Sequence, residues 1–336
     1  MKLSEFSGLY TTFPLESATR TMAISLFPYS DLMRSDVLNL WAESLPLDAI
    51  TADIFEGRVL LDENFDPQTF LLAHENGKLS GFVLGVYAKR MLLGDADPQG
   101  TRSWITALGV RQNADLHKVG DKLIAEVEQR FKALGKKECV VSGYPPGYFT
   151  PGLDQKAYAH LLNLFSGHGY QKFHEAISMD AAIVTFTVSE TIQEKQRKLE
   201  SQGIKVRPYM RTDLVNFLGF LERFMPSDWV RVERRNLKKL IEGGFHPEQI
   251  SVVTKGDSII GYCQFEGSHF GPFGISDEFQ GQGIGTVLLA RTLERMRQEG
   301  YHDAWVIWTD DVAAKVYQKF GFKETRRFSI LKKQLV

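Results

Sequence analysis

The residues of this chain best suited to chemistry lie in one glycine-rich run. Residues 280–285 read Gln-Gly-Gln-Gly-Ile-Gly, with glycine at every second position. Because glycine has no Cβ, backbone N–H groups in such a run can approach an anion closely. Residues 270–275 before the run have the pattern of a strand, and apolar residues after it recur at helical spacing as far as a capping Gly300. The spacing predicts a turn between a strand and a helix that can bind a pyrophosphate.

The surrounding residues exclude two common nucleotide motifs. A dinucleotide-binding fingerprint needs Gly or Ala three residues after Gly283, where this chain has Thr286, and the next strand-like run, residues 304–308, lacks a ribose-binding acid. A nucleoside-triphosphate loop would need Gly-Lys-Ser/Thr after the glycines, which the run does not have. The pattern that remains is Gln-x-x-Gly-x-Gly, followed downstream by Tyr317 and Gly321-Phe322.

This pair of motifs resembles the GNAT family, the Gcn5-related N-acetyltransferases. In that family an Arg/Gln-x-x-Gly-x-Gly/Ala loop binds the pyrophosphate of acetyl-CoA, and a Tyr-x-x-x-Gly-Phe motif lies on the following helix. The chain also has the family's order of elements, with a strand at 302–309, a short helix at 312–320 and a final strand. The alternative is a glycine-rich turn with a purely structural role.

The chain repeats this pattern once. Residues 76–85 and 255–265 each read as a hairpin turn followed by a strand, and Gly135 matches Gly300 as a helix cap. The offset between copies is 180 positions from Gly81 to Gly261 but only 152 from Gly169 to Gly321, so the first copy carries insertions. Two stretches of loop composition, residues 89–101 and 143–154, are the expected insertions.

The resemblance and the repeat together imply the fold. We expect an α/β protein (α+β mixed sheet) of two tandem GNAT-like domains, each a mixed, mostly antiparallel sheet flanked by helices with one splayed strand pair. The expected N-terminal domain covers residues 1–185, with its first strand starting at Met22, and is degenerate. A charged linker helix covers 186–203, and the acetyl-CoA-binding, catalytic domain covers 204–336.

The two copies differ in the residues that would bind the cofactor. Aligned on the helix, the first copy reads His117 to Lys122 where the second has the glycine run, so a single glycine, Gly120, is left. In this alignment Lys122 stands in place of Gly285, and Asp121 adds a negative charge at the mouth of an anion site. The first copy also has Phe165 where the second has Tyr317. We expect only the second copy to bind acetyl-CoA.

The resemblance assigns the cofactor contacts to the glycine run and the strand before it. Pro272 lacks an N–H, which fits a strand that leaves its neighbour rather than one inside an unbroken ladder. A backbone amide in this strand would polarise the thioester carbonyl. The expected cofactor-binding residues are Phe273, Gly274, Ile275, Gln280, Gly281, Gln282, Gly283, Ile284, Gly285 and Thr286.

Catalysis needs an acid for the departing thiolate and a base for the amine. By resemblance Tyr317 is the acid, although a core aromatic on an amphipathic helix is the alternative. Three residues are candidates for the base: Glu266, His269 and Asp310, the last standing where many family members have asparagine. Glu266 as a solvated hairpin residue and His269 as a core histidine are the competing interpretations.

The acceptor pocket is expected between the first two helices of the second copy and the strand ends. Aromatic planes beside an acid suit an amine carried on a small scaffold. The expected acceptor residues are Phe224, Asp228, Trp229 and Trp308. The predicted reaction is transfer of an acetyl group from acetyl-CoA, as co-substrate, to a small-molecule primary amine, with an amino sugar as one option. A peptide amine and a non-catalytic acyl-CoA-binding regulator are the alternatives.

Composition limits the partners. A net charge of −1 over 336 residues gives no whole-chain case for nucleic acid or an acidic membrane. The eight histidines form no metal-binding spacing, so we expect no metal, and the two cysteines, Cys139 and Cys263, each lie in an apolar run typical of buried free thiols. No signal-peptide or membrane-spanning pattern is present, which predicts a cytoplasmic protein. The sequence is also compatible with a homodimer.

Overall fold

The computed structural model describes residues 23–89, 98–145 and 147–335. Residues 1–22 of the expected first domain, including Met22, lie outside this part of the chain, as do residues 90–97 of the first expected insertion.

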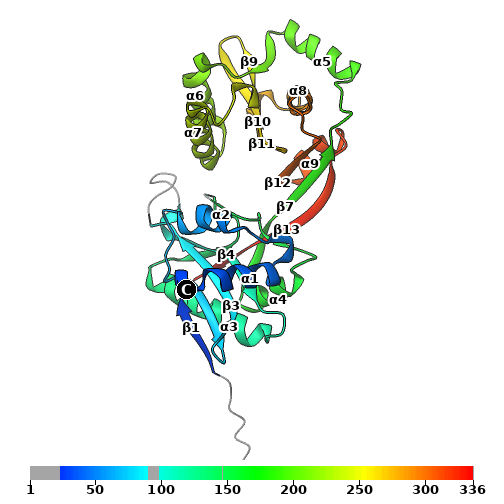
Figure 1. Ribbon diagram of the computed structural model, residues 1–336. Coiled ribbons are helices and arrows are strands. Elements are labelled where there is room, and N and C mark those ends of the chain that lie inside the picture. The colour runs from blue at the N-terminus through cyan, green and yellow to red at the C-terminus, as the bar shows by residue number, and fades with distance from the viewer. Residues whose placement is uncertain (1–22, 90–97, 146, 336) are drawn as a thin grey trace, which may run out of the picture.

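The first half of the chain forms one set of strands and helices (Figure 1). Its strands are β1 (Ile24–Pro28), β2 (Phe70–Glu75), β3 (Lys78–Tyr87), β4 (Arg102–Val110), β5 (Glu138–Val141), β6 (Leu153–Asp154) and β7 (Gln171–Ala182). Its α-helices are α1 (Arg34–Ser44), α2 (Ala52–Phe55), α3 (Leu116–Ala133) and α4 (Ala159–Gly167).

The second half repeats this arrangement after a linker helix, α5 (Glu190–Ser201). Its strands are β8 (Ile204–Pro208), β9 (Ile250–Lys255), β10 (Ser258–Glu266), β11 (His269–Ile275), β12 (Asp303–Thr309) and β13 (Lys323–Gln334). Its α-helices are α6 (Leu214–Phe224), α7 (Ser227–Glu242), α8 (Ile284–Gln298) and α9 (Asp311–Gln318). Both expected hairpins form: Asn76 and Gly77 turn β2 into β3 with φ of 54° and 75°, and Gly256 turns β9 into β10 with φ of 57°.

The described strands build a single 13-stranded sheet that runs through both halves. The order is β1-β2-β3-β4-β5-β13-β7-β12-β11-β10-β9-β8, with β6 paired to β13 outside this path. Among the strands of the described ranges, only β4–β5 and β11–β12 are parallel pairs, and the rest are antiparallel. The expected fold class, a mixed, mostly antiparallel sheet flanked by helices in two tandem units, is confirmed.

The two halves exchange strands at the centre of this sheet. Strand β13, from the end of the chain, lies between β5 and β7 of the first half, and β7 in turn pairs with β12 of the second half. In Figure 1 the two long strands run from the upper unit into the lower one. The core of the first half accordingly contains the late residues Phe328, Ile330, Leu331 and Leu335. The sequence-based domain boundaries stay a prediction, and the exchange means that neither core is made from one continuous stretch of chain.

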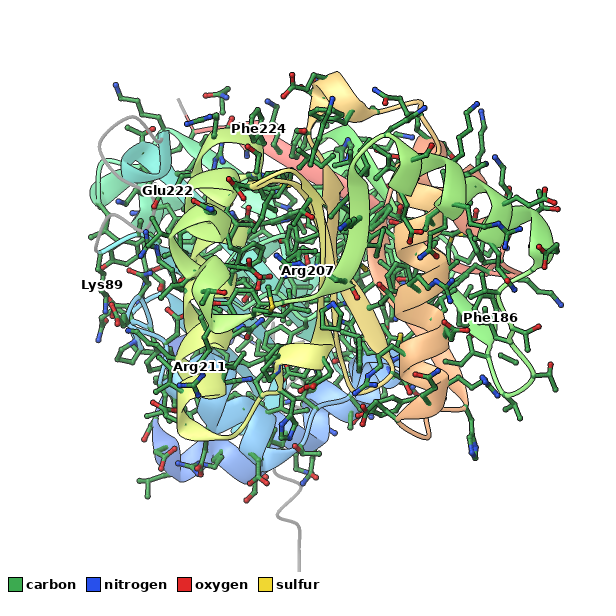
Figure 2. All side chains as sticks on the ribbon, turned by 90° about the horizontal axis from the view of Figure 1, so that it is seen from above. Lys89, Phe186, Arg207, Arg211, Glu222 and Phe224 are labelled. Carbon is green, nitrogen blue, oxygen red and sulfur yellow. The ribbon has the colours of Figure 1, made fainter. Side chains whose placement is uncertain are left out.

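In the second half, helices cover the sheet on both faces. Seen from above, α6, which carries Glu222 and Phe224, and α8 lie on opposite sides of the strands (Figure 2). The amphipathic pattern explains this, because alternate residues of β10 point to opposite faces. Cys263 and Phe265 pack with α8, whereas Tyr262 packs with Phe217 and other residues of the α6 and α7 layer.

Both cysteines are buried free thiols, as expected. Within residues 23–89, 98–145 and 147–335, no helix is both long and apolar enough to cross a membrane. The same ranges contain no group of three or more His, Cys, Asp and Glu residues that could hold a metal ion.

Arg326 on the exchanged strand β13 pairs with two carboxylates of the first half. Arg326 donates two hydrogen bonds to Asp48, at 2.6 and 2.9 Å, and one to Asp154 at 2.7 Å. Burial alone would raise the pKa of Asp154, but hydrogen bonds from Arg326 and from backbone N–H groups outweigh it and lower the pKa below its usual value. The next residue, Arg327, pairs with the more exposed Glu324 and Glu175 instead.

Replacing Arg326 with methionine should therefore destabilise the protein by about 3 kcal/mol at pH 7, because two largely buried carboxylates lose their partner. Since the pKa of Asp154 is lowered by folding, this stabilisation is present above the unfolded pKa of about 3.9 and is lost as the pH falls below it. Urea unfolding of wild type and Arg326→Met at pH 7 and pH 3 measures both effects. Arg327→Met is the matched control and should cost under about 1 kcal/mol. Equal losses from the two substitutions would contradict the anchoring role.

Candidate active site

The expected splay of two parallel strands is present at β11 and β12. The two strands pair at a single position, His269 with Trp305, and then separate. Among the described strands, the rest of this edge of β11 as far as Ile275 has no neighbour on that side. On its other side, the ladder with β10 shifts register between Cys263 and Phe265, next to Pro272, as the missing N–H predicted. The open edge of β11 leaves backbone groups free for an extended ligand.

The glycine run that follows β11 forms the expected turn at the start of α8. Gly281 and Gly283 have φ of 74° and 80°, a conformation that favours glycine, and Gly283 is the N-cap of α8. Gly285 has a different reason to be glycine: a Cβ there would lie 3.2 Å from the ring of Phe273. Two of the three glycines therefore shape the turn, and the third lets α8 approach β11.

The glutamine side chains of the run hold the turn together. Gln280 donates to the carbonyl oxygen of Ile275 at 3.1 Å and to Asp277 at 2.8 Å, and Gln282 donates to the carbonyl oxygen of Glu278 at 3.2 Å. Their side-chain donors are used within the loop, so the backbone N–H groups at the N-terminus of α8 are the groups suited to an anion.

A lysine that the sequence did not single out lies over this turn. Lys195, on the linker helix α5, is so close to Gly283 that a Cβ at that glycine would lie 2.8 Å from Lys195 Cδ and 3.3 Å from its Nζ. Helix α5 is held against α8 by a 2.7 Å hydrogen bond from Arg291 to Gln196. An ammonium group beside an anion-binding turn adds a charge-assisted partner for phosphate.

Tyr317 lies at the splayed edge, on α9. Its ring centroid is 5.1 Å from that of Phe270 and 6.1 Å from that of Phe273, both on β11, and 5.9 Å from that of Phe322. Burial raises its pKa above the ordinary value of about 10. The phenol therefore keeps its proton through neutral pH and can act as a proton donor but not as a base. The tyrosine is part of the core and also borders the site.

The three candidate bases have separate surroundings. Glu266 is exposed and forms an ion pair with Lys239 at 2.8 Å. Burial lowers the pKa of His269 to about 4, so its ring, which lies 4.4 Å from Trp305, is neutral at pH 7 and only weakly basic. Asp310 is the N-cap of α9 and accepts hydrogen bonds from the first backbone N–H groups of that helix.

The expected acceptor residues divide between two places. The connection from α6 to α7 lies directly on β11, because a Cβ at Gly274 would lie 2.5 Å from Met225 Sδ and 3.2 Å from the Trp229 ring. Asp228 begins α7 beside these residues. Phe224 is 41% exposed at the end of α6. These residues form a lid over the middle of β11.

Trp308 instead faces the first half of the chain. Its ring contacts Tyr148 of that half, with centroids 5.5 Å apart. Burial and then the Asp228 carboxylate raise the pKa of Tyr148 to about 12. Arg231 on α7 donates to the carbonyl oxygen of Pro145 at 3.2 Å. The second expected insertion of the first copy, residues 143–154, therefore reaches the acceptor side of the second copy.

The ends of the helices correct the alignment of the two copies. Helices α3 and α8 end at equivalent positions, followed by Gly135 and Gly300, both with positive φ. On this register Gly120 corresponds to Gly285, and Lys118 corresponds to Gly283. Lys122 therefore does not stand at Gly285, and Asp121 lies within the helix, 2.9 Å from His168 rather than at the mouth of a site. The sequence alignment was wrong by two residues because it was not referred to the helix cap Gly135, which matches Gly300.

The corrected register leaves the first copy poorly suited to a pyrophosphate. The Asp115 carboxylate caps α3 by accepting from the backbone N–H of Lys118 at 3.0 Å, so it occupies the helix end where an anion would bind. Lys118 itself pairs with Glu75 at 2.6 Å. A further acid, Glu43, borders a cavity of about 320 Å³ at this mouth and pairs with Arg111 at 2.8 Å.

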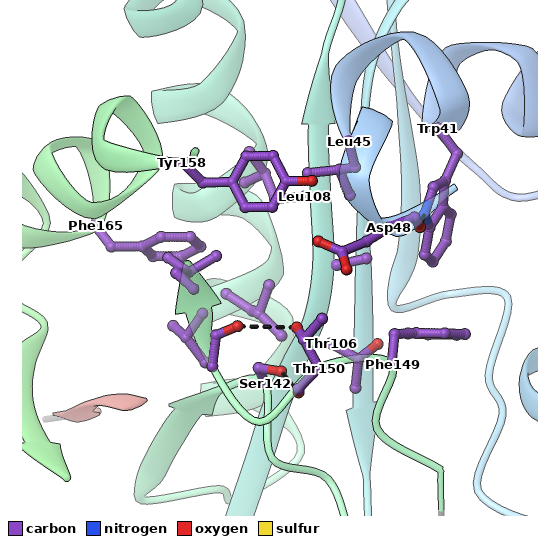
Figure 3. A pocket seen from close by; sticks show the side chains of 15 residues that line it. Trp41, Leu45, Asp48, Thr106, Leu108, Ser142, Phe149, Thr150, Tyr158 and Phe165 are labelled. Carbon is purple, nitrogen blue, oxygen red and sulfur yellow. Dashed lines mark hydrogen bonds between the residues drawn. The ribbon is translucent and has the colours of Figure 1, made fainter. Parts of the chain in front are cut away.

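The first copy also fills the space between β4 and β5. A cavity of only about 30 Å³ remains there, lined by residues that include Trp41, Asp48, Thr106, Tyr158 and Phe165. Figure 3 shows these side chains converging from several elements. Since ligand pockets are typically some hundreds of Å³, this space does not fit an extended arm without rearrangement.

Comparison with known proteins agrees with this geometry. Residues 231–330 match the model of the acetyltransferase (GNAT) domain family. No curated protein sequence matches the chain. The fold is similar to the GCN5-related glucosamine N-acetyltransferase region of a fungal multi-domain GH3 β-N-acetylglucosaminidase, with a TM-score of 0.77 and 16% identity. That match covers 93% of this chain but 38% of the fungal protein, so this chain spans well under half of its length.

Two further structures match along nearly their whole length. A GCN5-related N-acetyltransferase from Sphaerobacter thermophilus has a TM-score of 0.66 and 14% identity, over 93% of this chain and 96% of that one. A tandem GNAT protein from the clavulanic acid biosynthesis pathway has a TM-score of 0.59 and 12% identity, over 94% and 99%. The chain therefore shares the fold of these GNAT structures, one of which is a tandem GNAT protein. The match to the acetyltransferase (GNAT) domain family covers residues 231–330, within the second half of the chain.

The glycine turn can be tested against its equivalent in the first copy. Gly283→Glu should weaken acetyl-CoA binding at least about 100-fold, because it strains a positive-φ position and adds negative charge at the phosphate site. Lys118→Glu, the matched change in the first copy, should leave the dissociation constant unchanged. Isothermal titration with acetyl-CoA measures both. Equal weakening in two folded variants would show that the first copy binds the cofactor too.

The role of Lys195 can be tested on the linker helix. Lys195→Gln should raise the dissociation constant of acetyl-CoA by about 10-fold at low salt, and less at high salt, since an exposed phosphate contact is screened. Lys198→Gln changes an exposed lysine on the same helix and should have no effect. If both substitutions weaken binding alike, Lys195 contributes only general positive charge.

Proposed function

We propose that this protein is an N-acetyltransferase that moves an acetyl group from acetyl-CoA to a primary amine of a small molecule. The observation that carries the proposal is the coincidence of three features in the second copy: the open edge of β11, the glycine turn at α8, and Tyr317 beside the splay. Acetyl-CoA supplies the acetyl group as a thioester. The backbone edge of β11, the turn at Gly281 and Gly283, and Lys195 are the groups that fit its arm and phosphates.

The chain's own residues supply the rest of the chemistry. A backbone N–H of β11 polarises the carbonyl of the acetyl group. Tyr317, which keeps its proton at neutral pH, gives that proton to the departing sulfur, whose thiol has an ordinary pKa of about 8.5. The lid formed by Met225 and Trp229 keeps water from the middle of β11. The proposed reaction needs no metal.

We propose that the first copy binds no acetyl-CoA and serves as a wall of the acceptor site. Its Asp115 cap, its filled cavity and its Phe165 support the first part, and the contacts of Tyr148 and Pro145 with the second copy support the second. The similarity to a glucosamine N-acetyltransferase region favours an amino sugar as the acceptor. A peptide amine and a non-catalytic acyl-CoA-binding regulator are the alternatives to be excluded.

A coupled assay of thiol release with a panel of primary amines tests the function. The panel contains glucosamine, an aromatic amine, free amino acids and a peptide with a free amino terminus. We expect release above the hydrolysis rate with at least one small amine. Tight acetyl-CoA binding without turnover on any amine would favour the regulator, and turnover on the peptide alone would favour a protein acceptor.

Tyr317→Phe should lower kcat about 100- to 1,000-fold and change the dissociation constant of acetyl-CoA less than about 3-fold. The reason is that the ring packing against Phe270 is kept while the proton donor is lost. Steady-state kinetics and isothermal titration together measure the two quantities. An unchanged kcat would remove Tyr317 from the mechanism.

A further inference from the structure

A cluster of buried polar side chains lies between α7 and β10, on the acceptor side of the second copy. Glu233 and Asn236 project from the same face of α7, since they are three residues apart, and are 0% and 1% exposed. The Tyr262 hydroxyl donates to Glu233 Oε1 at 3.4 Å, and the Asn236 amide donates to Gln264 Oε1 at 3.3 Å. Neither Glu233 nor Asn236 was a candidate from the sequence.

Two oxygen atoms in this cluster lack partners. Glu233 Oε2 and Asn236 Oδ1 are both buried and have no hydrogen-bond partner within the part of the chain that the structure describes. Leaving a buried polar atom unpaired costs free energy, and more when the group is charged. Both atoms are of the same kind, because an ionised carboxylate oxygen and an amide oxygen can only accept. When Glu233 is ionised, each of the two atoms therefore needs a hydrogen-bond donor.

The buried Glu233 carboxylate also favours a partner of positive charge. Burial raises the pKa of Glu233 to about 8, and the hydrogen bond from Tyr262 and the charge of Arg235 offset only part of this shift. On the strand side, burial first, then the Glu233 charge and to a smaller extent that of Asp228, raise the pKa of Tyr262. A donor that carries a positive charge would stabilise the ionised form of Glu233 more strongly than a neutral donor such as the Tyr262 hydroxyl.

The cluster lies one strand away from the open edge of β11. Tyr262 is directly opposite Gly274 in the ladder between β10 and β11. Trp229 lies over both positions. Its ring centroid is 6.2 Å from that of Tyr262, and its ring is next to Gly274. The lid residues, the polar cluster and the strand that would polarise the acetyl group therefore adjoin one another.

We infer that Glu233 and Asn236 form the subsite for the ammonium group of the acceptor, and that Glu233 takes the proton that the amine must lose before it attacks. An ammonium group has three N–H donors and one positive charge, which match the two free acceptors and the carboxylate. The ammonium N–H bond breaks, the proton goes to Oε2 of ionised Glu233, and the nitrogen keeps the electron pair for the new bond to carbon. The C–S bond then breaks, the sulfur takes the proton of Tyr317, and the second proton of the nitrogen restores the Tyr317 phenol. The inference rests on the proposed acetyl transfer to an amine.

Methylammonium chloride is the probe, because it carries the ammonium group alone. Tetramethylammonium chloride at the same ionic strength is the control, because it has the positive charge but no N–H donor. We expect methylammonium to raise the melting temperature of the wild-type protein more than tetramethylammonium does. The concentration dependence of this difference gives a dissociation constant.

Glu233→Gln should weaken methylammonium binding at least about 10-fold, since a charge-assisted hydrogen bond is lost while the shape is kept. Asn236→Leu, which removes the other acceptor, should weaken it less and provides a second test should Glu233→Gln fail to fold. Glu222→Gln alters an exposed carboxylate on α6, paired with Arg234, and should change nothing. With the best amine of the panel, Glu233→Gln should lower kcat/KM at least about 100-fold without changing acetyl-CoA binding.

Equal effects of the two salts on the wild type, or unchanged methylammonium binding in Glu233→Gln, would overturn the inference and would indicate that a water molecule fills the site. The outcome is separate from that of the amine panel. Methylammonium binding that depends on Glu233, without turnover on any amine, would leave the subsite standing and reject the transfer. Turnover that survives Glu233→Gln would support the transfer and reject the subsite.

Discussion

The pairing of β7 with β13 is the interaction on which the rest of the structure depends. Each long strand completes the sheet of the other half, so the two copies share one sheet and cannot separate without breaking this central ladder. This constraint fixes the loop around Tyr148 against Trp308 and α7, where the acceptor is proposed to bind. The first copy, which we propose binds no cofactor, is therefore still needed for the fold and adjoins the proposed site of the second copy.

Local patterns in the sequence predicted much of the site. The glycine run, Pro272 and Tyr317 each impose a local condition: positive φ, a missing N–H and a position on a short helix. All three are visible without knowledge of the rest of the fold, and the structure places them together at the splay of β11 and β12. The repeat, with its two hairpins and two helix caps, likewise predicted two units of the same architecture.

Features that depend on distant contacts could not be predicted in this way. The exchange of β7 and β13 joins residues some 150 positions apart, and nothing in either strand marks its partner. Lys195 looked like one charge among many on a linker helix until its place over Gly283 was known. Glu233 is one of several charged residues of α7, and its complete burial distinguishes it. The register of the first copy, in contrast, could have been predicted, because the helix cap Gly135 matches Gly300 and fixes the offset at 165 positions.

The central claim is that one of two similar folds in this chain binds the cofactor. The number of acetyl-CoA molecules bound per chain, measured by isothermal titration of the full-length protein and located by a crystal structure of the complex, tests it most directly. We expect one molecule, lying along β11 with its phosphates at the turn of Gly281 and Gly283. Two molecules per chain, or one between β4 and β5 of the first half, would contradict it.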